Sequence, residues 1–570
     1  MEMTNLYIKN LIKKMTLDQK VGAVLTLGFA GTVPRPHIYE FVEKYHCGGL
    51  RLSCDMRTFG SYVNPKSAKV VVSVENDNGI KYRGDAPVCT ASEYKAVLDD
   101  LQEAARKRPL GIPLHFSYDQ EGGTSADFCF GGVNLFPKPM GIRATNDAHL
   151  AYEVACAVAK QSKAVGFNWI HSPVLDVCSE PKNPEIYTRA YSDDAEVVSE
   201  YALETCRGFK QENMIATGKH FPGRGHSDID AHFEVPVIDV DYETLQKREL
   251  LPYKRLIEKG CLPSIMIAHS IFPAIDPDNI ATVSKKVVTG LLRNTLHFDG
   301  VITTDSMTMG AIATRYGVAN ACALALEAGA DLVLMKAETD LVKDTIDAIK
   351  DFIHTGRITE MQLEEKVYRI LNLKYEYGMF FDNTNHDEMP EKVLQDPAIK
   401  NLAKLVARRS VIVAKQQDSA LPLCATENVL VVEQKVKGYN NTQWHSGILY
   451  EAILKYNPKA NYVETSYTYD EEDKLRILAK AQQAETLVFT NYFIRGSLCN
   501  KDWLADFIGN TNKKVIVVTN TPFNEISIPE NASNVVVTFA TSPENIKVTA
   551  GVLFGKIYPE GVWPIEKAIL

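Results

Sequence analysis

The chain has 570 residues, of which 45% are hydrophobic and 23% are charged, and its formal net charge is −9. A chain of this length exceeds what one hydrophobic core supports, so about two or three domains are expected. The acidic balance argues against nucleic acid or an anionic membrane as a partner, and no apolar run approaches the roughly 20 residues of a membrane span.

The N-terminal segment and the cysteines indicate the compartment. The first 21 residues place lysines among apolar residues at helical spacing. They lack the continuous apolar stretch and the small-residue cleavage site of a signal peptide, so none is predicted. The eleven cysteines are scattered and include no Cys-x-x-Cys pair. This usage indicates buried or free thiols in a reducing compartment, and we expect a cytoplasmic protein.

Short apolar, β-branched runs alternate with amphipathic segments through the first two thirds of the chain. Eight strands separated by helices are typical of a parallel (β/α)8 barrel, which takes about 250 residues without insertions. The predicted strands are 21–27, 48–52, 114–118, 167–170, 214–217, 264–268, 300–304 and 332–335. The predicted helices between them include 148–165, 195–212, 242–259, 285–296 and 318–328. The largest insertion, 53–90, is predicted to form a hairpin or long loop at the barrel mouth.

A polar stretch that begins at residue 381 is predicted to be an interdomain linker. Beyond it the alternation restarts, which predicts a smaller, doubly wound α/β domain. Its predicted strands are 410–414, 429–433, 486–490, 515–519 and 535–539, and its predicted helices are 447–455, 470–481 and 544–554. The predicted division is 1–380 for the barrel, 381–405 for the linker and 406–570 for the second domain. The second domain contains no Gly-x-Gly-x-x-Gly or phosphate-loop motif, so no nucleotide cofactor is expected.

Polar residues follow the carboxyl ends of five successive predicted barrel strands, the edge where barrel enzymes build their active sites. In strand order they are Asp119, then Asp176 with Arg189 further along the same loop, Lys219 with His220, His269, and Asp305. An Asp at a strand end is often a helix N-cap, and that alternative applies to Asp176 and Asp305. Five in succession are harder to explain by capping. A desolvated carboxylate such as Asp305 can also act as a nucleophile or stabilise a cationic transition state.

The loop at 218–232 contains three histidines, two aspartates and a lysine. Asp230 and His232 are two residues apart, so in an extended segment their side chains point the same way. Asp230 can then accept a hydrogen bond from the His232 ring and fix its tautomer, which prepares the ring to donate and retrieve a proton. The alternative is a metal site built from His220, His226, Asp228 and His232, whose spacing matches no standard zinc signature.

These motifs together resemble glycoside hydrolase family 3, in particular its β-N-acetylglucosaminidase branch. The resemblance runs from residues 12–22 through Asp-Gln-Glu-Gly-Gly at 119–123 to residues 553–556, and it is most specific at 219–225 and at Asp230 and His232. It implies that Asp305 is the nucleophile of a retaining mechanism and that His232, oriented by Asp230, is the general acid and base. It further implies sugar contacts for Asp119, Arg189, Lys219 and His220, with supporting roles for Asp176 and His269.

The resemblance implies an exo-acting enzyme that removes terminal β-linked N-acetylglucosamine from small glycosides such as cell-wall or chitin fragments, with no cofactor and no metal. A histidine acid/base becomes neutral after protonating the leaving group, where a glutamate becomes anionic, so phosphate is an alternative acceptor to water. Nothing in the sequence specifies an oligomeric state.

This chain departs from the family pattern at three places, one of which is the insertion 53–90, longer than the family pattern leads us to expect. The family continues the Asp-Gln-Glu-Gly-Gly motif with arginines, whereas residues 124–127 here are Thr-Ser-Ala-Asp, and Arg224 stands where the family has a histidine. These departures favour an altered sugar pocket, so a β-glycosidase or a phosphorylase with another sugar preference is an alternative. A metal-dependent barrel hydrolase and a catalytically silent sugar-binding protein are the alternatives from other classes.

Overall fold

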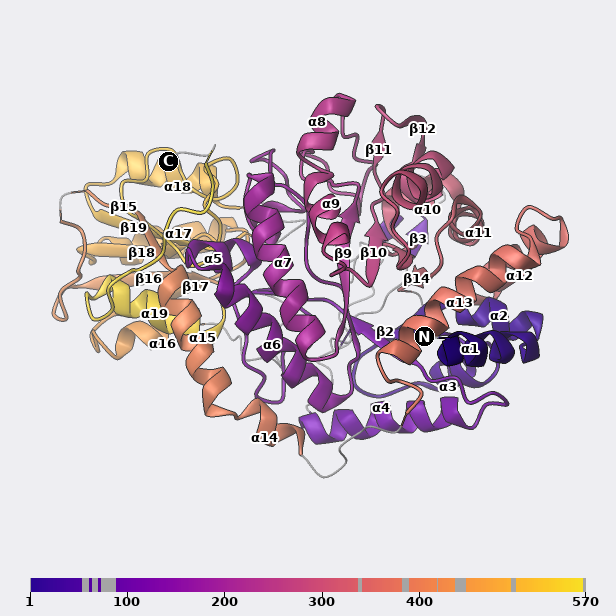
Figure 1. Cartoon of the computed structure of the whole chain (residues 1–570). Helices are drawn as coiled ribbons and strands as arrows, with labels where there is room; N and C mark the ends of the chain where they lie inside the picture. Colours follow the sequence, from indigo (N-terminus) through magenta and orange to yellow (C-terminus); the bar gives the residue numbers. More distant parts are fainter. Residues whose placement is uncertain are drawn as a thin grey trace.

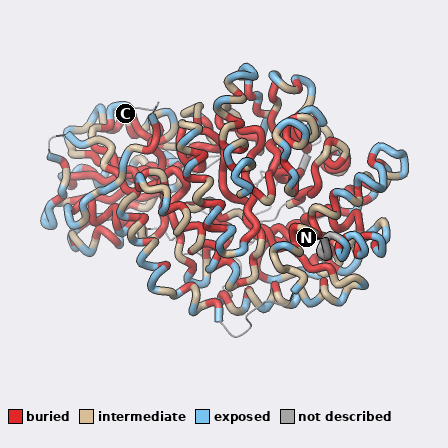
Figure 2. The backbone as a smooth tube through the Cα atoms, viewed as in Figure 1, coloured by how far each residue is buried: buried red, intermediate tan, exposed pale blue. Residues whose placement is uncertain are grey.

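The structure, a computed structural model, describes residues 2–53, 61–63, 70–72, 89–336, 341–381, 389–417, 419–435, 447–493 and 499–566. An eight-stranded sheet with its helices forms one part of the molecule, and a six-stranded sheet, coloured orange to yellow, forms the other (Figure 1). In both parts the strands are buried, and exposed residues gather on the outer helices and loops (Figure 2).

The predicted barrel is confirmed. Eight parallel strands pair in the order β13-β10-β9-β8-β5-β2-β1-β14, and a bridge between Thr303 and Leu332 brings the two edge strands together, so the sheet is nearly closed. All six residues of β1 are buried, as expected for a parallel strand covered on both faces. The strands are β1 Leu25–Ala30, β2 Gly49–Ser53, β5 His115–Tyr118, β8 Trp169–Ile170, β9 Ile215–Phe221, β10 Ser264–Ile267, β13 Val301–Thr304 and β14 Val333–Met335.

Two predicted strand boundaries are wrong in ways that local chemistry explains. Residues 21–23 belong to helix α2 (Leu17–Ala23), which Thr16 and Gln19 start through reciprocal capping hydrogen bonds, so the first strand begins only at Leu25. The fifth strand runs four residues further than predicted, to Phe221. Lys219 and His220 therefore lie within the strand itself, where the sheet fixes their backbone.

Helices cover the outer side of the barrel sheet (Figure 1). The predicted helix 242–259 is two helices, because Pro252 starts the second of them. The helices are α1 Glu2–Lys14, α2 Leu17–Ala23, α3 Pro36–Glu43, α4 Ala91–Arg106, α5 Pro139–Ala144, α6 Ala148–Val165, α7 Ala195–Gln211, α8 Tyr242–Lys247, α9 Leu251–Glu258, the π-helix Lys286–Thr295, α10 Gly310–Tyr316, α11 Val318–Ala328, α12 Leu341–His354 and α13 Glu360–Glu376. Within the described residues, no helix has the length and apolar character needed to cross a membrane.

Within the described ranges, three short antiparallel strand pairs lie in the loops of the barrel part. One pair, β3 (Ser61–Val63) with β4 (Val70–Val72), falls in the predicted insertion 53–90, and most of that insertion lies outside the described residues. The second pair, β6 (Gln120–Gly122) with β7 (Ser125–Ala126), folds the segment after β5 back on itself. The third pair is β11 (Ile271–Phe272) with β12 (Asp276–Ile280).

The second part is the predicted smaller α/β unit. Its six strands pair in the order β15-β20-β19-β18-β16-β17, and all pairs are parallel except that between β15 and β20. The strands are β15 Ile412–Lys415, β16 Val429–Gln434, β17 Asn461–Thr465, β18 Thr486–Thr490, β19 Lys514–Thr519 and β20 Val535–Val537. The helices are α16 Ile448–Leu454, α17 Glu471–Ala481, α18 Lys501–Asn510 and α19 Pro543–Leu553. Strand β17 and helix α18 were not predicted.

An apolar cluster lies between the two parts and joins Ile186 and Tyr187 of the barrel to Phe493 and Phe539 of the second part. The Tyr187 and Phe493 rings meet edge to face with centroids 5.0 Å apart. The chain crosses between the parts through α14 (Pro390–Leu394) and α15 (Pro397–Ser410). Because Tyr187 begins the short 3-10 turn that carries Arg189, the second part supports a segment of the barrel that bears a predicted site residue.

A buried carboxyl in the second part makes its stability depend on pH. Glu433, at the end of β16, is 2% exposed and accepts hydrogen bonds from the backbone amides of Leu449 and Tyr450 at the start of α16. Burial raises the pKa of Glu433 to about 7, outweighing these two hydrogen bonds. The folded protein thus holds a proton on Glu433 between pH 4.5 and about 7, where the unfolded chain has released it.

We expect the free energy of unfolding to fall by up to about 3 kcal/mol as pH rises through this window, and Glu433→Gln to remove that decrease. The check is urea unfolding of both proteins at several pH values from 4.5 to 8. Glu530→Gln, at an exposed position of the same part, is the control and should keep the wild-type slope. Equal slopes in the wild type and in Glu433→Gln would contradict the assignment.

Candidate active site

All nine predicted site residues lie at the carboxyl end of the barrel strands or in the loops that follow them. A cavity of about 250 Å³ opens there. Six of the nine line it: Asp119, Arg189, Lys219, His220, His232 and Asp305. The other three, Asp176, Asp230 and His269, are buried, and each contacts a lining residue or its chain neighbour.

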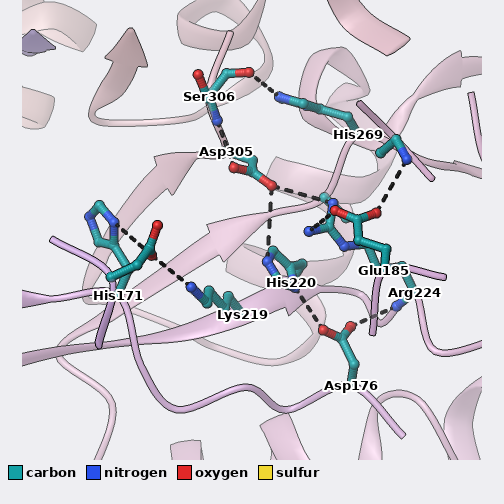
Figure 3. Close-up of polar contacts among 12 residues, drawn as sticks. His171, Asp176, Glu185, Lys219, His220, Arg224, His269, Asp305 and Ser306 are labelled. Atoms are coloured by element: carbon teal, nitrogen blue, oxygen red, sulfur yellow. Dashed lines mark hydrogen bonds and ion pairs between the residues drawn. The ribbon is translucent and has the colours of Figure 1, made fainter. Parts of the chain in front are cut away.

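Asp305 follows β13 and faces the other charged groups of the cavity (Figure 3). Its Oδ1 accepts a 2.7 Å hydrogen bond from the Ser306 amide, and its Oδ2 lies 3.3 Å from Nη1 of Arg224 and 4.0 Å from Nε2 of His220. Burial alone raises the pKa of Asp305, but the positive groups around it, Arg224 foremost among them, together outweigh burial, so that pKa lies well below its usual range. Asp305 is therefore a buried carboxylate that stays ionised at any ordinary pH.

The N-cap alternative does not describe Asp305 or Asp176. The helix after Asp305, α10, begins at Gly310 with Met309 at its N-cap. Asp176 has no exposed surface, and its carboxylate accepts from Nδ1 of His220 at 2.7 Å and from the backbone amide of Arg224 at 2.8 Å. Both carboxylates therefore act on other side chains and loops of the site rather than on the end of a helix.

His220 is held as a neutral ring. Its Nδ1 donates to Asp176, and its Nε2 lies 3.4 Å from Nη2 of Arg189, which can only donate. Burial lowers the pKa of His220 well below its usual value, and the charges of Arg224 and Arg189 lower it further. Burial also raises the pKa of Asp176 to about 6. The pair thus presents an oriented ring nitrogen at the cavity wall.

Asp230 and His232 form the predicted pair. Asp230 Oδ1 accepts from both the backbone amide and Nδ1 of His232, each at 2.8 Å. The segment is a turn, with the amides of Phe233 and Glu234 donating to the Asp230 carbonyl, so the predicted extended conformation is wrong although the predicted contact is made. Because Nδ1 is engaged by the carboxylate, Nε2 is the nitrogen of His232 left to exchange a proton with a ligand.

Arg224 and Glu185 lie between Asp305 and the Asp230–His232 pair and contact both. Neither was predicted as a site residue. Arg224 Nη2 lies 2.9 Å from Glu185 Oε1, which is also 3.4 Å from Nδ1 of His232. Burial opposes ionisation of Glu185, but the adjacent Arg224 charge and the His232 ring together lower its pKa to about 2. One buried ion pair, drawn in Figure 3 beside Asp305, thereby reaches Asp305 through Arg224 and the Asp230–His232 pair through Glu185.

The opposite side of the cavity is a second network of charges. Lys219 Nζ lies 2.8 Å from Asp119 and 2.5 Å from Glu121, and Arg189 binds Glu121 through two hydrogen bonds of 2.7 and 2.9 Å. Arg51, on β2, pairs with Asp119 and lies 2.6 Å from Asp127. These fixed donors and acceptors suit a ligand that carries many hydroxyl groups.

His269 supports the site from behind. It is buried, and its Nε2 donates a 3.0 Å hydrogen bond to the Ser306 carbonyl. The Ser306 amide in turn binds Asp305. His269 thus fixes the backbone next to the carboxylate.

The predicted metal alternative is not assembled. Among the described residues, one group of three potential ligands has its atoms within 4.8 Å of one another, and it consists of Glu185, Asp230 and His232. His226 instead lies 3.1 Å from Ser179 Oγ, and His220 binds Asp176. The set His220, His226, Asp228 and His232 is therefore not brought together.

Comparisons with known proteins show a family and a fold that this chain shares. The family described as "Glycosyl hydrolase family 3 N terminal domain" matches residues 16–373. A β-hexosaminidase A from Pseudoalteromonas piscicida is 26% identical over 72% of this chain and 69% of its own length. A β-hexosaminidase from Nitrosomonas eutropha is 34% identical over 46% of this chain and 76% of its own. A family 3 β-N-acetylglucosaminidase from Paenibacillus sp. str. FPU-7 superposes on 98% of this chain and all of its own, with a TM-score of 0.84 and 27% identity.

Proposed function

This chain belongs to glycosyl hydrolase family 3, and we propose that it is an exo-acting, retaining β-N-acetylglucosaminidase that releases terminal N-acetylglucosamine from small glycosides such as cell-wall or chitin fragments. The observation that carries the proposal is the pairing of an ionised, buried carboxylate, Asp305, with a histidine held by a carboxylate, His232, in one polar cavity. This set can attack a sugar on one side and protonate its leaving group on the other.

The proposed reaction has two steps. In the first, an Asp305 oxygen forms a bond to the anomeric carbon while the bond to the leaving oxygen breaks, and His232 Nε2–H gives that oxygen its proton. In the second, neutral His232 takes a proton from water, whose oxygen attacks the anomeric carbon and frees Asp305. Two displacements at one carbon retain its configuration. Asp230 orients the ring in both steps.

The remaining residues bind or position. We assign sugar hydroxyl contacts to Asp119, Arg189, Lys219 and His220, which line the cavity with their donors and acceptors already fixed by neighbours. Asp176 and His269 receive supporting roles, because they hold His220 and the backbone beside Asp305. We add Arg224 and Glu185 as positioning residues for Asp305 and His232.

Three further statements belong to the proposal. Water is the proposed acceptor, and phosphate is the alternative to it, because a histidine leaves no negative charge to repel phosphate after the first step. We place the protein in the cytoplasm, since no disulfide joins the cysteines in the described part of the chain. We propose the division into a barrel at 1–380, a linker at 381–405 and a second domain at 406–570. We propose a structural role for the second domain, because its apolar cluster includes barrel residues.

The test is chromophore release from an aryl β-N-acetylglucosaminide and from the matching β-glucoside, each with and without phosphate. We expect faster turnover of the N-acetyl substrate, independent of phosphate. Dialysis against a chelator should leave the rate unchanged, because neither proposed step uses a metal.

Each other outcome selects an alternative. Phosphate-dependent formation of a sugar 1-phosphate makes the protein a phosphorylase, and preference for the glucoside makes it a β-glucosidase. Loss of activity on chelation that zinc restores contradicts the proposed mechanism and points to the cluster of Glu185, Asp230 and His232 as a metal site.

A further inference from the structure

Among the residues that the structure describes, five lysine and arginine side chains line the cavity, and four of them are matched by carboxylates. Arg51, Arg189, Lys219 and Arg224 each lie 3.3 Å or less from at least one carboxylate oxygen. Their charges are therefore largely committed to the protein's own network. The fifth cation is Lys336, which directly follows β14.

Lys336 differs from the other four in what surrounds its ammonium group. The nearest carboxylate oxygen is Asp119 Oδ2, 3.7 Å from Nζ and beyond hydrogen-bond distance, and that oxygen already receives Arg51. Within the described part of the chain, the Lys336 ammonium has no hydrogen-bond acceptor, although its side chain is only 25% exposed. An ammonium group that is partly withdrawn from water and has no acceptor from the protein is stabilised by an acceptor that a ligand supplies.

Lys336 lies close to two residues of the proposed sugar site, Asp119 and Asp305. It stands beside Asp119, a proposed sugar contact, and its charge contributes to lowering the pKa of Asp305. Burial, with help from Arg51, lowers the pKa of Lys336 to about 8 against the opposing effect of Asp119. The group is thus a partly desolvated cation that gains from an added negative charge.

We propose that Lys336 binds an anionic substituent, a carboxylate or a phosphate, carried by the sugar that occupies the cavity. This inference rests on the proposed function, because it takes Asp119 and Asp305 as parts of the sugar site. The carboxylates near Lys336 do not exclude such a group, since Asp119 is paired with Arg51 and Lys219 and Asp127 with Arg51.

The loss of the Asp305 charge during the proposed reaction also favours an anionic sugar. When Asp305 forms its ester with the sugar it loses its negative charge. The net charge of the cavity is unchanged, because His232 gives up its proton in the same step, but the carboxylate charge next to Arg224 and near Lys336 is lost. Arg224 then keeps only Glu185 as a paired carboxylate, and Lys336 loses the nearby Asp305 charge. A negative group on the sugar offsets this change while the intermediate exists, whereas a neutral sugar does not.

Binding measured by calorimetry tests the inference without requiring turnover. The probes are N-acetylglucosamine, its 6-phosphate, its 3-O-lactyl ether and inorganic phosphate alone. We expect at least one anionic sugar to bind the wild type more tightly than the neutral sugar does. Lys336→Met should weaken that binding by about tenfold to a hundredfold and the binding of the neutral sugar by much less.

Two variants serve as controls. Lys343→Met removes the same charge from an exposed position on α12 and should leave every affinity unchanged. Lys336→Arg keeps the charge and should retain the preference for the anionic sugar. A thermal melt of each variant verifies that it is folded.

The other outcomes overturn the inference. Equal weakening of neutral and anionic sugars by Lys336→Met means that the lysine binds a hydroxyl, and tight binding of phosphate alone means that the anion is a free acceptor. Hydrolysis of the neutral aryl glycoside without any anion preference removes the inference and keeps the proposed function. Preference for an anionic sugar without hydrolysis of any glycoside keeps the inference and removes the proposed function.

Discussion

Replacing Asp305 with asparagine is expected to lower kcat for an aryl β-N-acetylglucosaminide by at least about 10⁴-fold, the scale seen when a covalent nucleophile is removed. Asparagine has nearly the same shape, and its amide oxygen can still accept from the Ser306 amide. What disappears is the negative charge that attacks the anomeric carbon and that the Arg224 guanidinium holds ionised. The loss should therefore fall on kcat, with the melting temperature little changed.

Asp299→Asn is the matched control, because it makes the same chemical change at an exposed position just before β13. It should retain wild-type kinetics. A fluorinated aryl glycoside that slows the second step should add the mass of one sugar to the wild type and none to Asp305→Asn. A sugar adduct on the variant, or a loss of less than about tenfold, would show that another residue is the nucleophile.

The barrel and its active edge could be predicted because each strand is a short apolar run and parallel strands end at a common edge. That rule alone brought Asp119, His220 and Asp305 together from segments far apart in the sequence. This prediction works because the strands of a parallel barrel are buried along their whole length, so each one shows in the sequence as a continuous apolar run. The prediction failed where hydrophobicity is ambiguous, as at 21–23, which a capping box turns into helix.

Residues whose partners come from other elements were missed. The role of Glu185 depends on its contacts with Arg224 and His232. The role of Arg51 depends likewise on Asp119 and Asp127. These residues are far apart in the sequence, so no motif spacing predicts the contacts. One signal was available: the segment after Gly123 lacks the family's arginines, and the structure supplies a guanidinium there from β2. A missing charge in a motif is therefore a reason to search the neighbouring strands for its replacement.

In the second part, strand β17 was missed for a related reason. It lies at the edge of the sheet, and only two of its five residues, Asn461–Thr465, are buried. An edge strand with polar residues gives a weak apolar signal, whereas the central strand β18 is buried throughout and was predicted correctly. What fixes β17 is its parallel pairing with β16, a long-range contact.

Replacing His232 with glutamine is expected to reduce kcat/KM by about 10²- to 10⁴-fold for an alkyl glycoside, whose leaving group needs a proton. For a dinitrophenyl glycoside, which departs without one, the first step should be much less affected. The second step still lacks its base, so the glycosyl intermediate should accumulate as a burst of chromophore. This split between leaving groups belongs to an acid/base role and is not expected from a general loss of structure.

His149→Gln, on the exposed side of α6, is the control and should behave as the wild type with both leaving groups. Asp230→Asn should show the same dependence on the leaving group but a smaller loss, since the ring keeps Glu185 Oε1 3.4 Å from its Nδ1. Azide should speed the second step in His232→Gln, because this nucleophile needs no base and no side-chain carboxylate has been added to repel it. Equal losses for both leaving groups, with no burst, would assign His232 to sugar binding and require another residue as the acid. Glu185 would then be the first to examine, because it lies next to His232 and bonds the backbone of the same turn at Ala231.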